Sequence, residues 1–143
     1  MNYRSLGIAA IAAWVVDSIY GFLVFGLALN SEFARYPGVF RSFEAVSGML
    51  PLMFGASLVG TLAVTYIFAK GHEGGSGMAE GLRFGVVFAV FGLFSMSIPN
   101  YVIYNFGRLL AVESAVGGFV EMLLMGLVIG LVYKPAPRSS ASR

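Results

Sequence analysis

The stretch that decides the fold, residues 6–29, reads LGIAAIAAWVVDSIYGFLVFGLAL and contains a single charged residue, Asp17. As an α-helix its 24 residues would rise about 36 Å, which matches a hydrocarbon core of about 30 Å crossed with modest tilt. A secretory signal has a shorter apolar region, of about 7–15 residues. We therefore predict that this stretch is an uncleaved transmembrane helix.

Three more apolar stretches of comparable length follow, at residues 50–69, 81–104 and 112–132. None alternates strictly between apolar and polar residues, as a membrane β-strand would. The sequence thus predicts an all-α fold, an integral membrane bundle of four transmembrane helices forming one domain over residues 1–134. The polar remainder, residues 135–143, is predicted to be a disordered cytoplasmic tail.

Composition supports the membrane class and excludes several functions. Only 11% of the residues are charged, against roughly a quarter in a soluble domain, too few to cover so small a protein in water. The absence of cysteine excludes disulfides and thiolate chemistry. The basic residues are scattered, so we expect the lipid bilayer, and no nucleic acid, as partner.

Orientation follows from the distribution of basic residues. With four spans, both termini and the turn after the second span share one side, which carries six basic residues, against three on the other side. The positive-inside rule then predicts that both termini are cytoplasmic, in the plasma (inner) membrane. The first set is Arg4, Lys70, Arg83, Lys134, Arg138 and Arg143, and the second is Arg35, Arg41 and Arg108.

Small residues indicate how the helices pack, because lipid provides no hydrophobic drive between them. Ala9, Ala13, Asp17 and Gly21 recur at intervals of four and form one stripe along the first helix. In the fourth span, the pair Gly126 and Gly130 matches GxxxG, which suits the bundle core and a homodimer seam equally well.

Asp17 and Glu121 are the sharpest functional signal. Each lies near the middle of its span, where an acid costs about 2.5–3.5 kcal/mol on insertion scales, and no basic residue lies at that depth. Two such acids could share a proton or bind a cation. The alternative is that both stay protonated and hydrogen-bond neighbouring helices.

The third span offers polar groups that could join this site: Ser95, Ser97 and Asn100. Pro99 frees the carbonyl of Ser95 and is expected to kink the helix there. No metal or cofactor site is expected, because the single histidine, His72, has only Glu73 nearby and is interpreted as a solvated loop residue. Glu80 and Arg83 are interpreted as an exposed helical pair.

The long connection at residues 30–49 interleaves aromatic and charged residues. This mixture is typical of a segment lying at the lipid headgroups. We favour a membrane-hugging connector over a lid that covers a substrate.

Two segments, SIYGFLVFG (residues 18–26) and GGFVE (residues 117–121), resemble uncharacterised families of small four-span bacterial membrane proteins. The resemblance implies a layout and no activity. We rank a non-enzymatic membrane subunit or scaffold first, with a membrane-protein partner. A proton- or cation-coupled small transporter, acting as a homo-oligomer, follows closely. An intramembrane enzyme comes last, because no nucleophile has a base within the membrane.

Overall fold

The computed structural model describes residues 1–136, and every regular element in that range is helical. Four helical segments are long and apolar enough to cross a membrane: Tyr3–Ala28, Leu50–Gly71, Gly77–Ile103 and Arg108–Val132. The predicted all-α fold with four spans is therefore confirmed.

Two of these segments change helix type along their length. The first consists of α1 (Tyr3–Gly21) and a π-helix, η1 (Phe22–Ala28). The third consists of α5 (Gly77–Gly92), the π-helix η2 (Leu93–Ser97) and α6 (Ile98–Ile103). The second and fourth are single helices, α4 (Leu50–Gly71) and α7 (Arg108–Val132), and the connection after η1 holds the short helices α2 (Asn30–Phe33) and α3 (Phe43–Ser47).

Local chemistry explains where several helices begin and end. The Asn2 side chain accepts a hydrogen bond from the Ser5 amide (3.2 Å) at the start of α1, the usual role of an N-cap. Pro51 lies in the first turn of α4, where no backbone donor is lost. In the hairpin between α4 and α5, Gly74 has φ 91°, a conformation that glycine adopts without steric cost.

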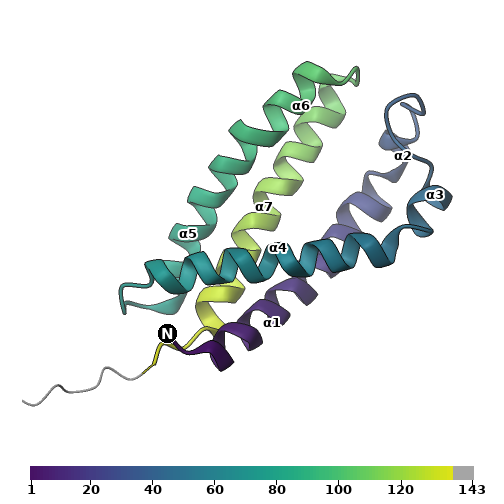
Figure 1. The fold of residues 1–143 in the computed structure, drawn as a ribbon. Helices are drawn as coiled ribbons and strands as arrows, with labels where there is room; N and C mark the ends of the chain where they lie inside the picture. The colour runs from purple at the N-terminus through teal and green to yellow at the C-terminus, as the bar shows by residue number, and fades with distance from the viewer. Residues whose placement is uncertain (137–143) are drawn as a thin grey trace, which may run out of the picture.

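The helices form two packed pairs that diverge from one end of the bundle (Figure 1). α5 and α7 run side by side, and α1 packs against both α7 and α4. α4 crosses the α5–α7 pair at a steep angle and has few contacts with α7 (Figure 1). The two ends of the described chain meet, since the Lys134 amide donates to Ser5 Oγ (2.6 Å).

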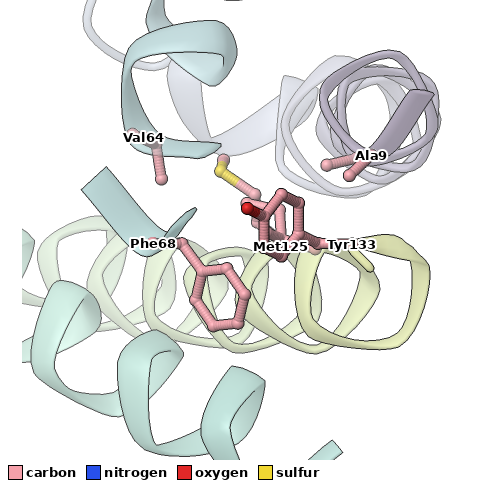
Figure 2. Close-up of a cluster of buried hydrophobic side chains, with 7 residues drawn as sticks. Ala9, Val64, Phe68, Met125 and Tyr133 are labelled. Atoms are coloured by element: carbon pink, nitrogen blue, oxygen red, sulfur yellow. The ribbon is translucent and has the colours of Figure 1, made fainter. Parts of the chain in front are cut away.

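The hydrophobic core lies in the half of the bundle that holds Met1 and the end of α7. Figure 2 shows side chains from α1, α4 and α7 converging there. Ala9 and Ala13 are completely buried, so the small-residue stripe of α1 faces the other helices. The remaining members come from the second half of α4, from the end of α7 and from the residue that follows α7: Val64, Phe68, Met125, Ile129 and Tyr133.

A seam of glycines joins α5 to α7. A Cβ on Gly126 would lie 2.6 Å from the Gly81 carbonyl oxygen and 2.6 Å from Gly85 Cα. Gly77 and Gly130 are opposed in the same way one turn further on. The GxxxG motif therefore serves the inside of this bundle, because the two backbones touch where side chains are absent.

Three of the observed spans begin earlier than expected, the first of them at Tyr3 rather than residue 6. The third begins at Gly77 rather than residue 81, and the fourth at Arg108 rather than residue 112. Polar residues at a helix start, such as Glu80 and Arg108, do not interrupt the helix, although they end the apolar run that marks it in the sequence. Of the expected tail, residues 137–143 lie outside the described residues.

Candidate functional site

A partly enclosed cavity of about 480 Å³ lies between α1, η1 and α4. It occupies the half of the bundle away from the core: Leu50 and Phe54 come from the beginning of α4, and Phe22 and Phe25 come from η1. The helices pack tightly in the half that holds the hydrophobic core, and they diverge from there. Space for a cavity therefore remains only in the other half of the bundle.

Asp17 and Glu121 both line this cavity. Asp17 follows the buried Ala13 by one turn of α1, and Glu121 precedes the buried Met125 by one turn of α7. The two acids therefore form the floor of the cavity, directly on the core. Gly21 lies against Glu121, because a Cβ there would be 3.2 Å from Glu121 Oε1.

Neither carboxylate has a partner within residues 1–136. No ion pair involves Asp17 or Glu121, and no side-chain hydrogen bond reaches them from any residue in that range. In the described part of the chain no group of three or more acidic or histidine side chains could hold a metal ion.

Trp14 fixes the wall of the cavity by tying α1 to α4. Its indole Nε1 donates to Ser57 Oγ (2.9 Å) and also approaches the Phe54 carbonyl oxygen (3.2 Å). Its ring meets that of Phe54 edge to face, with centroids 6.3 Å apart. Both Ser57 and Phe54 line the cavity, so this contact sets the spacing of two of its walls.

A second tie joins α1 to α7 beside the floor. The Tyr20 hydroxyl donates to the Gly117 carbonyl oxygen (3.0 Å). Gly117 is buried, and a Cβ there would come within 3.1 Å of Phe25 Cζ. Glycine at this position lets η1 approach α7 closely and holds Phe25 at the edge of the cavity.

The connection between η1 and α4 contributes to the wall of the cavity. Arg41, Phe43, Val46 and Ser47 all belong to its lining. The connection also packs on the loop before α7, where the rings of Phe40 and Phe106 lie 5.5 Å apart. The connection therefore forms part of the cavity wall, and its expected place at the lipid headgroups stays a prediction.

The polar groups expected from the third span are not at this site. Ser95, Ser97 and Asn100 are absent from the cavity lining, and Ser95 and Asn100 are exposed on the outside of the bundle. Pro99 lies in the first turn of α6, two residues after the end of η2, so the helix is distorted close to where a kink was expected. The distortion is a π-helical segment. It does not open a pocket for the two acids, because the cavity that they line lies between other helices.

His72 is buried, and its interpretation as a solvated loop residue was wrong. Its side chain is only 7% exposed and its Nδ1 lies 2.5 Å from Glu80 Oε2. The Glu80 carboxylate also accepts from the amides of Glu73 (3.0 Å) and Gly75. Glu80 thus closes the α4–α5 hairpin, and the pair made by Arg83 is with Glu73 (2.9 Å) instead.

No protein-family model, curated protein or solved structure matches this chain. The site is therefore interpreted from its own residues. Sequence reasoning did not find Trp14 and Ser57, although an indole N–H in the middle of an apolar span signals a partner on another helix. It also did not find Ser18, whose hydroxyl is buried without a partner in the cavity wall.

Proposed function

We propose that this chain is a small multi-pass membrane carrier that binds a proton or another cation between Asp17 and Glu121. The single observation that supports this is that both acids line one cavity without a partner. An acid that serves only to hold helices together would hydrogen-bond a neighbouring helix. Ionisable residues inside a membrane that face a cavity are typical of ion and proton pathways.

The sequence alone ranked a non-enzymatic subunit or scaffold first. The shared cavity favours the carrier instead, because a scaffold has no need of two unpaired acids at its centre. A carrier of four helices is expected to work as a homo-oligomer, since so few helices rarely enclose a pathway alone.

We further propose that both termini are cytoplasmic and that the membrane is a bacterial inner membrane. The excess of basic residues on the side of the termini supports this orientation. The part of the cavity lined by Arg41 would then lie toward the outer side. A reporter fused to the C-terminus that proved extracytoplasmic would reverse the orientation.

Dicyclohexylcarbodiimide tests the proposal, since this apolar reagent modifies protonated carboxyl groups in apolar surroundings. The protein is placed in lipid nanodiscs, treated over a range of pH, and mapped by mass spectrometry. We expect modification at Asp17 or Glu121 that decreases as the pH rises, because a binding site must exchange its proton.

The Glu113→Gln variant is the matched control, because Glu113 lies on α7 outside the cavity lining. It should leave the modification and its pH dependence unchanged. Modification independent of pH would identify permanently protonated acids that only join helices. That outcome, or no modification at either acid, would refute the proposed function.

A further inference from the structure

The walls of the cavity are made of rings and aliphatic chains. Phe22, Phe25, Phe43 and Phe54 contribute aromatic surface, and Leu50 and Met53 contribute aliphatic surface. The volume of about 480 Å³ falls within the range of about 300–1,000 Å³ typical of small-molecule sites. A molecule that fills this space must present an apolar body to most of the wall.

The floor of the cavity has the opposite character. Asp17 and Glu121 bring two carboxylates with no basic partner within residues 1–136. Arg41 is the one basic residue in the lining, and it belongs to the connection between η1 and α4, where its Nη1 contacts Met49 Sδ (3.3 Å). Charge at the floor therefore selects a positive group, since a buried charge needs an opposite charge nearby.

From these two features we propose that the cavity binds a monovalent organic cation with an apolar or aromatic body. The carboxylates pair with the positive group, the phenylalanine faces surround it through cation–π contacts, and the body fills the remaining space. This inference rests on the proposed function and names its substrate class.

A hard divalent cation fits the same floor less well. Hard cations such as Mg²⁺ and Ca²⁺ require six or more oxygen ligands. The floor offers the two carboxylates and the unpartnered Ser18 hydroxyl, whereas the Ser57 hydroxyl is already engaged with Trp14 and with the Phe54 carbonyl. An organic cation needs only the countercharge, because the apolar wall solvates its body.

The charge balance also predicts coupling to protons. A monovalent ligand neutralises one carboxylate, and a proton on the other keeps the floor neutral. When both acids are protonated before binding, entry of the cation breaks one carboxylic O–H bond and releases that proton to water. Binding is then an exchange of one cation for one proton.

Tetraphenylphosphonium is a suitable probe, and tetraphenylborate has the same shape with the opposite charge. Binding is measured by equilibrium dialysis on the full chain in nanodiscs, with protein-free nanodiscs subtracted to remove partition into lipid. We expect saturable binding of tetraphenylphosphonium alone. We also expect bound tetraphenylphosphonium to protect Asp17 or Glu121 from dicyclohexylcarbodiimide.

The decisive variant is Asp17→Asn combined with Glu121→Gln, compared with the matched control Glu113→Gln. Removing the countercharge should weaken tetraphenylphosphonium binding by about tenfold or more, whereas the control should bind as the unmodified protein does. Circular dichroism establishes that both variants are folded. If the double variant does not fold, the single variant Glu121→Gln is compared with Glu113→Gln instead. The protection of the acids by tetraphenylphosphonium in the unmodified protein then provides the second test.

Equal binding of the cation by the double variant and the unmodified protein would overturn the inference. Equal binding of tetraphenylborate, or no saturable binding of tetraphenylphosphonium, would do the same. If the acids still show pH-dependent modification in those cases, the proposed function stands and only the substrate class is wrong. If that modification is also absent, both fail.

Discussion

The glycine seam between α5 and α7 gives a sharp prediction for Gly126→Ala. The new methyl group would lie 2.6 Å from the Gly81 carbonyl oxygen, 2.6 Å from Gly85 Cα and 2.7 Å from Gly85 N. All three are backbone atoms, so no side chain can rotate away. To reach the ordinary contact distance of 3.4 Å, the helices must separate by about 0.8 Å, which loosens their closest interface.

Overpacking of this kind typically costs about 1–3 kcal/mol, and we expect Gly126→Ala to lose that much free energy of unfolding. Gly118→Ala is the matched control on the same helix, because a Cβ there meets nothing within 4 Å. The control should be neutral, or be stabilised by up to about 1 kcal/mol through the higher helix propensity of alanine.

Stability can be measured by titrating the protein in mixed micelles with sodium dodecyl sulfate. Trp14 is the only tryptophan, so its fluorescence reports the α1–α4 contact, while circular dichroism reports the loss of helix. Gly126→Ala should unfold at a lower mole fraction of the detergent than the unmodified protein. If Gly126→Ala proves as stable as Gly118→Ala, the two backbones do not touch at this seam.

Two further predictions concern other contacts of the bundle. Trp14→Phe removes the donor to Ser57 Oγ and should lower the free energy of unfolding by about 0.5–1.5 kcal/mol. Circular dichroism in the same titration measures this change. Unchanged stability would show that the indole makes no such bond. Glu80→Ala removes the acceptor for the amides of Glu73 and Gly75, so hydrogen–deuterium exchange at these two amides should become faster. Glu44→Ala, in the exposed helix α3, is its control and should leave their exchange unchanged.

The candidate site was predictable only in part. The acids at positions 17 and 121 stand out because charge is costly in a long apolar run, and that signal is local to each helix. The expectation that Ser95 and Asn100 would join them failed, because a residue's depth along its own helix says nothing about the face it presents to other helices. His72 was misjudged for the same reason: Glu80 reaches it across the hairpin from a different helix.

The sequence by itself determined the number, length and helical nature of the spans. A membrane permits few structures, since every backbone polar group must be satisfied within the segment that crosses it, so an apolar run of sufficient length already implies a helix. The helical nature of a span can therefore be predicted from residues that are neighbours in the sequence.

Only the tertiary structure decided which helices pair and where the space between them lies. The glycines of α7 fit several partners in principle, and it is the backbone of α5 that fills the gap opposite them. This pairing, and the tight core beside the termini, leave the cavity at the other end with Asp17 and Glu121 as its floor. Packing depends on contacts between residues far apart in the chain, and for that reason no single stretch of sequence encodes it.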